Sequence, residues 1–100
     1  MENSAQPAAG SEKYTFILFI SGMSVKSGHA IENLRHICDK HLAGNYTLEI
    51  IDISSNKQKA VDYQIIAIPT LIKTGPEESR KILGDLSDTG KVLRILDIKP

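Results

Sequence analysis

The chain has a single cysteine, Cys38, and no excess of charge of either sign. One cysteine excludes an internal disulfide and the Cys-x-x-Cys pair of a disulfide oxidoreductase, and it fits a reducing compartment. Twelve Lys and Arg residues balance twelve Asp and Glu residues. The chain therefore lacks the basic field that favours binding to nucleic acid or to an anionic membrane, and we expect neither partner.

Long hydrophobic runs are also missing. The longest apolar stretch, residues 16–20, is far below the roughly twenty residues that span a bilayer. Residues 1–12 have no signal-peptide apolar region. We therefore expect a cytoplasmic protein.

The overall amino-acid composition is that of one folded domain. The 100 residues are 41% hydrophobic and 24% charged, as in globular proteins, and they allow one modest core. Residues 1–12 are rich in Ser, Ala, Pro and Gly without an apolar period, which predicts a flexible leader. Residues 13–100 are expected to form the domain.

The first half of the domain reads as strand, helix, strand. Residues 14–20 are aromatic and β-branched on both faces, which is typical of a covered central strand. Ser24 or Ser27 can cap a helix whose apolar residues recur at helical spacing and which ends at Gly44. Residues 46–53 form a second strand, so the segment predicts a right-handed βαβ unit.

The second half begins after a polar stretch. Residues 65–73 are apolar but contain Pro69, which lacks the N–H that a central strand needs. Residues 80–83 predict a short strand that pairs back as a hairpin and closes at Gly84. Residues 87–98 fit a short capped helix nearly as well as an apolar strand.

This order of elements is that of the thioredoxin fold, an α/β architecture written βαβ-α-ββα. In that fold a cis-proline precedes the strand beside the usual catalytic site. Pro69, between Ile68 and Thr70, occupies the corresponding place.

Four segments resemble successive signatures of the KaiB family. They are Phe-Ile-Ser-Gly at 19–22, Ile-Asp-Ile at 51–53, Ala-Ile-Pro-Thr-Leu at 67–71 and Arg-Lys-Ile-Leu-Gly-Asp-Leu-Ser at 80–87. The match covers residues 14–96 without a gap, and the Gly-Asp-Leu-Ser corner is its most specific part.

The resemblance implies a non-enzymatic adaptor without a cofactor, which binds a KaiC-type ATPase or works with a histidine kinase. Its output is circadian timing or a stress-adaptation response. The resemblance also implies fold switching between a thioredoxin-like monomer and a homotetramer with the order βαββααβ, and it favours dimers or tetramers. The ambiguous pattern at residues 87–98 fits two packings of nearly equal free energy.

Four residues are candidates for the fold switch. Isomerisation of X-Pro bonds takes tens of seconds or more, so a bond before Pro69 or Pro76 that differed between two folds would slow the exchange. Gly84 and Asp85 form the corner before the last element, where two folds can need different backbone angles. The alternative for Gly84 is an ordinary turn glycine.

Four other residues are candidates for partner binding. Thr47 and Glu49 stand where clock members of the family carry a small residue and a lysine, so a charge is reversed there. Lys57 and Lys59, with the two basic residues of 80–83, either form a basic patch or are simply solvated charges.

Rival chemistry has little support. A redox or glutathione-type enzyme rests only on the architecture and on Pro69, and no nucleophilic cysteine stands at residues 21–24. An input module of a clock histidine kinase would require a fused kinase, for which 100 residues leave no room. Cys38 lies on the apolar stripe of the first helix, as expected for a small buried hydrophobe.

The histidines of the first helix do not predict a metal site. His29 and His36 are seven residues apart, a helix rise of about 10.5 Å, whereas paired helical ligands are four apart. His41 near the helix end is expected to interact with the last carbonyl groups.

Overall fold

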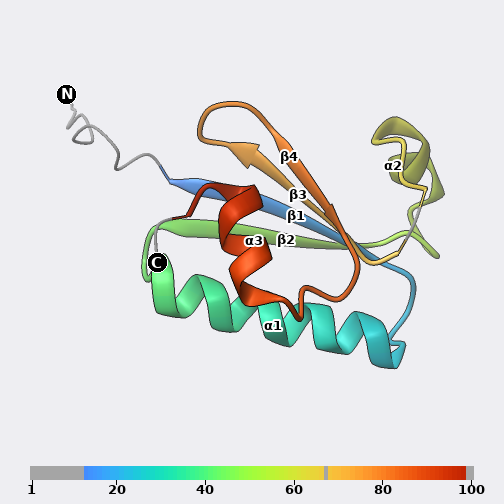
Figure 1. The fold of residues 1–100 in the computed structure, drawn as a ribbon. Helices are drawn as coiled ribbons and strands as arrows, with labels where there is room; N and C mark the ends of the chain where they lie inside the picture. Colours follow the sequence, from blue (N-terminus) through green and yellow to red (C-terminus); the bar gives the residue numbers. More distant parts are fainter. Residues whose placement is uncertain (1–12, 67, 99–100) are drawn as a thin grey trace.

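A computed structural model describes residues 13–66 and 68–98 (Figure 1). The predicted leader and the last two residues lie outside these ranges. Seven elements follow one another: β1 (Tyr14–Ile20), α1 (Val25–His41), β2 (Tyr46–Asp52), α2 (Lys57–Asp62), β3 (Thr70–Gly75), β4 (Arg80–Leu83) and α3 (Thr89–Leu96). This is the predicted order βαβ-α-ββα.

The four strands form one mixed sheet in the order β2-β1-β3-β4. β1 pairs with β2 in parallel and with β3 in antiparallel orientation, and β3 pairs with β4 in antiparallel orientation. β1 is therefore central, as its two-sided apolar sequence predicted. α1 makes the crossover between β1 and β2, which completes the βαβ unit.

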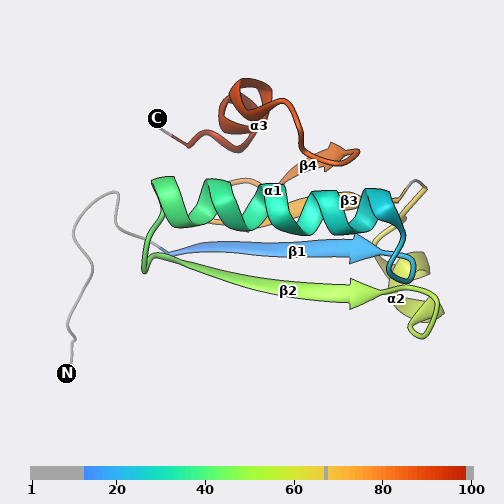
Figure 2. The ribbon, with the colours of Figure 1, turned by 90° about the horizontal axis from the view of Figure 1, so that it is seen from below.

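α1 and α3 cover one face of the sheet (Figures 1 and 2). The core beneath them includes Leu18, Leu34, Leu71 and Leu96, each fully buried. Cys38 belongs to the same core, and burial, with a smaller contribution from Asp39, raises the pKa of its thiol to about 12. This confirms that Cys38 is a buried hydrophobe and not a reactive thiolate.

The other face carries a smaller core at one end of the sheet. Phe19, Ile51 and Ile72 are buried there. Tyr63, which follows α2, packs its ring against Phe19 with 5.2 Å between the ring centroids. Ile65 completes the cover over this end.

Of the apolar stretch at residues 65–73, only the part after Pro69 is strand, because β3 begins at Thr70, as expected for a strand that a cis-proline precedes. Ile68-Pro69 is a cis peptide bond, and its proline offers no N–H to a sheet ladder, so the chain enters the strand after it. Ile66 is 88% exposed in the connection before Pro69. Ile65, Ile66 and Ile68 thus lie in the connection between α2 and β3.

The ambiguous segment at residues 87–98 contains helix α3. Asp88 is its N-cap and accepts a hydrogen bond from the Lys91 N–H at 3.1 Å. Val92 and Leu96 are four residues apart and buried, so their spacing places both on the sheet.

Candidate partner-binding surface

One end of the sheet gathers most of the residues singled out in the sequence. β1 and β2 both finish at this end, β3 begins there and β4 finishes there, as the register shows. Ligands and partners of α/β sheets commonly bind at the carboxyl ends of parallel strands. We call this region the carboxyl-end surface, comprising residues 21–25, 52–56, 61–66, 68–69 and 83–85.

Asp52, the last residue of β2, links two loops of the carboxyl-end surface. Its Oδ1 accepts hydrogen bonds from Gly22 N at 3.0 Å, Ser54 N at 3.0 Å and Ser54 Oγ at 2.6 Å. These bonds, with the Ser54 hydroxyl contributing most, lower the pKa of the Asp52 carboxyl. Its carbonyl oxygen also accepts from Asn56 Nδ2 at 3.0 Å. An ionised Asp52 therefore fixes the β1–α1 loop against the turn that precedes α2.

The carboxyl-end surface displays large apolar side chains. Met23 and Val25 are each 77% exposed at the start of α1. Val61 on α2 is 68% exposed, and Ile66 is 88% exposed. Single exposed apolar residues are ordinary, but four at one end of a small domain indicate a surface that a partner covers.

The structure brings three of the four fold-switch candidates together at this end. Gly84 N donates a hydrogen bond to the Pro69 carbonyl at 2.9 Å. Asn33 Nδ2 of α1 donates to the Asp85 carbonyl at 2.8 Å. Gly84 has φ +111°, in the region that favours glycine. Pro76 lies at the opposite end of the sheet. A cis peptide bond joins it to Gly75, the last residue of β3.

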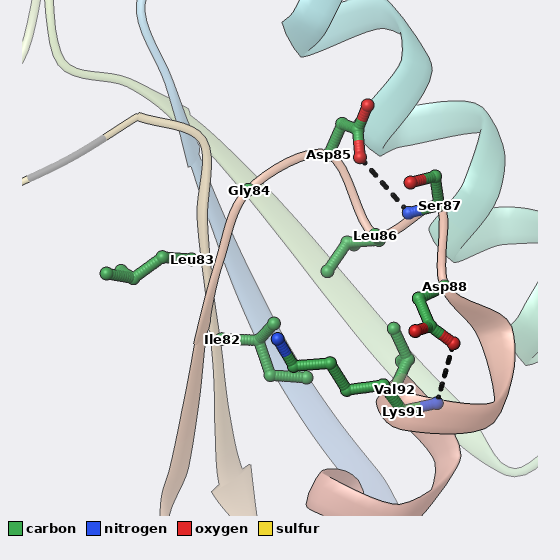
Figure 3. Close-up of a pocket in the computed structure, with 9 residues that line it drawn as sticks. All are labelled: Ile82, Leu83, Gly84, Asp85, Leu86, Ser87, Asp88, Lys91 and Val92. Atoms are coloured by element: carbon green, nitrogen blue, oxygen red, sulfur yellow. Dashed lines mark hydrogen bonds between the residues drawn. The ribbon is translucent and has the colours of Figure 1, made fainter.

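A shallow cavity of about 140 Å³ lies between β4 and the start of α3 (Figure 3). It is lined by Ile82, Leu83, Gly84, Asp85, Leu86, Ser87, Asp88, Lys91 and Val92. Asp85 Oδ1 accepts from Ser87 N at 3.2 Å, so both carboxylates of the cavity are engaged with backbone N–H groups. Ligand pockets usually enclose about 300 Å³ or more, so this cavity is a structural feature of the corner.

The predicted partner-binding residues do not form one cluster. Thr47 and Glu49 are exposed in the middle of β2, on the face opposite α1. Lys57 and Lys59 are exposed on α2, beyond the end of that strand.

Arg80 and Lys81 of β4 do not join Lys57 and Lys59 in a single basic patch. Arg80 and Lys81 are consecutive in a strand and so point to opposite faces of the sheet. Arg80 also forms an ion pair with Glu78 at 3.5 Å. The reading as separate solvated charges therefore fits the geometry better than a basic patch.

The KaiB domain family profile matches residues 17–98. This chain belongs to the KaiB family. It is 46% identical over 83 residues to the circadian clock protein KaiB3 of Synechocystis, covering 83% of this chain and 81% of that protein. It is 41% identical over 85 residues to the circadian clock oscillator protein KaiB of Microcystis aeruginosa, covering 85% and 82% of the two chains.

Solved structures place this KaiB-family domain in the thioredoxin fold. The N-terminal domain of Synechococcus elongatus SasA superposes with a TM-score of 0.72 at 23% identity, covering 96% of this chain and 94% of that one. The Drosophila thioredoxin Deadhead superposes with a TM-score of 0.68 at 13% identity, covering 86% and 80%. The comparison confirms the predicted architecture.

The chemistry of the carboxyl-end surface differs from that of a disulfide oxidoreductase. Residues 21–24 read Ser-Gly-Met-Ser, and Ser24 is engaged as the N-cap of α1. Within residues 13–66 and 68–98, no three His, Cys, Asp or Glu side chains gather as metal ligands. No helix in the same ranges is long and apolar enough to cross a membrane.

The residues that sequence reasoning missed are the ones that hold the loops. Asp52 was noted only within the family resemblance, although an Asp two residues before the polar run Ser54-Ser55-Asn56 is a signal for a side-chain-capped turn. Asn33 gives no such signal, because its partner Asp85 is 52 residues away.

Proposed function

We propose that this KaiB-family protein is a non-enzymatic adaptor that docks on a KaiC-type ATPase through its carboxyl-end surface. The observation that carries the proposal is the group of exposed apolar residues on the carboxyl-end surface, Met23, Val25, Val61 and Ile66. An ordered apolar surface loses little conformational entropy on binding. A histidine kinase is the alternative partner.

The adaptor proposal also agrees with the position of the single cysteine, which lies away from the carboxyl-end surface. Cys38, the one cysteine, is buried in the core with a raised pKa, and the loop after β1 carries serines. The relatives are named as clock proteins. We therefore propose an output in circadian timing or in a stress-adaptation response.

Fold switching is part of the same proposal. The segment after Gly84 carries apolar residues at 92, 93, 95, 96 and 98, a pattern that suits a strand nearly as well as the helix α3. The corner before it needs a glycine backbone conformation at Gly84. A second packing of this half, in a homo-oligomer, would bury the same apolar side chains differently.

The direct test mixes the full chain with the KaiC-type ATPase of the same organism and follows mass by size-exclusion chromatography with light scattering, from minutes to hours. The proposal predicts a stable complex, in which the adaptor co-elutes with the ATPase. A histidine kinase from the same organism is assayed in parallel. Failure to bind either protein would contradict the proposal.

The enzymatic alternative is tested by insulin reduction with dithiothreitol. A chain without a cysteine pair should give only the background rate. A Cys38→Ser variant is the matched control, and turnover that disappears in that variant would support the redox reading instead.

A further inference from the structure

The chain has three sulfur atoms, in Met1, Met23 and Cys38. Met1 lies outside the described residues. Cys38 is fully buried in the core, and the raised pKa of its thiol, about 12, makes the reactive thiolate scarce at neutral pH. Met23, in contrast, is 77% exposed. Within residues 13–66 and 68–98, Met23 is therefore the sulfur that a dissolved oxidant reaches first.

Hydrogen bonds on both sides hold Met23 in this exposed place. Gly22 N donates to Asp52 Oδ1 at 3.0 Å, which fixes the end of the β1–α1 loop that precedes Met23. Ser24, which follows Met23, is the N-cap of α1 and accepts from Ser27 N at 3.1 Å. The backbone at Met23 is thus held between two hydrogen-bonded neighbours, and its side chain is displayed to solvent.

Met23 also belongs to the exposed apolar group of the carboxyl-end surface. Val25 follows it at the start of α1, and Val61 and Ile66 lie at the same end of the sheet (Figure 1). Methionine suits such a surface, because its unbranched chain and polarizable sulfur adapt to the shape of a partner. A partner that covers this group removes the Met23 sulfur from water.

Oxidation changes the Met23 side chain from apolar to polar. A hydroperoxide supplies the oxygen: a lone pair of the thioether sulfur attacks the terminal peroxide oxygen, an S–O bond forms and the O–O bond breaks. The sulfur loses two electrons and becomes a sulfoxide. The peroxide is reduced to water or an alcohol, as the proton of the transferred oxygen passes to the leaving oxygen. The sulfoxide oxygen accepts hydrogen bonds, so an apolar partner that covers it leaves it unsatisfied.

We propose that Met23 is an oxidation site, and that its conversion to the sulfoxide by a hydroperoxide weakens docking through the carboxyl-end surface. The inference rests on the proposed function, because docking is the step that oxidation regulates. The folded state should be little affected, since the Met23 side chain is on the surface. A bound partner should cover Met23 and slow its oxidation.

The test treats the full chain alone with hydrogen peroxide, removes the peroxide, and measures affinity for the KaiC-type ATPase by biolayer interferometry. Trypsin releases residues 14–26 as a peptide with Met23 and residues 36–40 as a peptide with Cys38, so mass spectrometry locates the added oxygen. We expect one oxygen on the first peptide, none on the second, and an affinity about tenfold lower. The urea-unfolding midpoint should be unchanged.

Three variants separate Met23 from the other oxidisable groups. Met23→Leu keeps an apolar side chain of similar volume and should bind normally before and after peroxide. Met23→Gln carries a polar amide of similar length and should bind about tenfold more weakly without peroxide. Adding Ala43→Met to Met23→Leu places an exposed methionine at the opposite end of the sheet, and its oxidation should leave the affinity unchanged.

Several outcomes would overturn the inference. They are an oxidised chain that binds as tightly as the untreated chain, an equal loss of affinity in peroxide-treated Met23→Leu, and a peptide of residues 14–26 that gains no oxygen. The untreated chain distinguishes a failure of the proposed function. If the untreated chain binds neither the ATPase nor the histidine kinase, docking itself is contradicted, and its regulation by Met23 is contradicted with it.

Discussion

Gly84 shows at the scale of one residue how the corner before α3 is built. Its φ of +111° is accessible to glycine and strained for other residues, whereas a Cβ at this position would meet no atom within 4 Å. Position 84 therefore favours glycine because of its backbone conformation, and not because a larger side chain would lack space. Leu86, two residues later, also has positive φ and is buried, so the corner is held by packing.

We expect Gly84→Ala to lower the free energy of unfolding by about 1–3 kcal/mol, the usual cost of a strained backbone conformation. Gly28→Ala is the matched control, because Gly28 lies within α1 with open space around its Cα. That substitution should stabilise the protein by about 0.5–1 kcal/mol. Urea unfolding measures both, and equal midpoints for the two variants would contradict the account.

Asp52 gives a prediction of pH dependence. Hydrogen bonds from Ser54 and Gly22 lower the pKa of its carboxyl in the folded state. The stabilisation is therefore fully present above the unfolded pKa of about 3.9 and is lost as the pH falls through the lower folded pKa. An NMR titration should show the Gly22 amide shifting with a midpoint below that value. A midpoint above it, or an amide that does not respond, would refute the role assigned to Asp52.

Single residues also mark the limit of sequence reasoning. Lys73 appears as one charge in an apolar stretch, but it is 2% exposed, with Nζ 5.6 Å from the centroid of the Tyr14 ring. Cation–π contact and the long aliphatic stem make this burial tolerable. The pairing depends on the antiparallel contact of β1 with β3, which local sequence does not contain.

Helix α1 was predictable as an element because its signals are local. Ser24 was one of two candidate caps, and its Oγ accepts the hydrogen bond from Ser27 N at 3.1 Å. Apolar residues at helical spacing then fix the buried side. The start of β3 has a weaker local signal, because apolar residues stand on both sides of Pro69, and it was expected after Pro69 only through the fold; the structure places it at Thr70.

Loss of the N-cap of α1 should lower the free energy of unfolding by a predictable amount. Ser24→Ala removes the acceptor for one N–H of the first turn and should destabilise the protein by about 1 kcal/mol in thermal or urea unfolding. Ser21→Ala is the control, since Ser21 is exposed in the loop before the cap. Equal losses for the two variants would show that the cap contributes nothing specific.

α3 is the element whose type the sequence left open. Tertiary contact decides it: Tyr14 Oη donates to the Asp97 carbonyl at 3.2 Å, and Ile82 of β4 packs in the same core as Val92. Asp97, at φ +59°, ends the helix in a left-handed conformation. These partners are distant in sequence, which is why the local pattern did not distinguish helix from strand.

At the scale of the whole molecule, the fold gathers four exposed apolar side chains at one end of the sheet. At this carboxyl-end surface Asp52 joins the β1–α1 loop to the turn that precedes α2. The sequence predicted the fold and family, but it did not predict that Pro69 and Gly84 lie side by side. It did not predict the exposed group of Met23, Val25, Val61 and Ile66, because exposure is set by packing.

The most direct test of the adaptor account is the affinity of the KaiC-type ATPase for an Ile66→Asp variant, measured by biolayer interferometry beside the unmodified chain. The account predicts a loss of about tenfold or more, because a charge would be buried at the centre of the contact. Ala43→Asp introduces the same charge at the opposite end and should bind as tightly as the unmodified chain. Unchanged affinity of Ile66→Asp, or an equal loss in both variants, would contradict docking through the carboxyl-end surface.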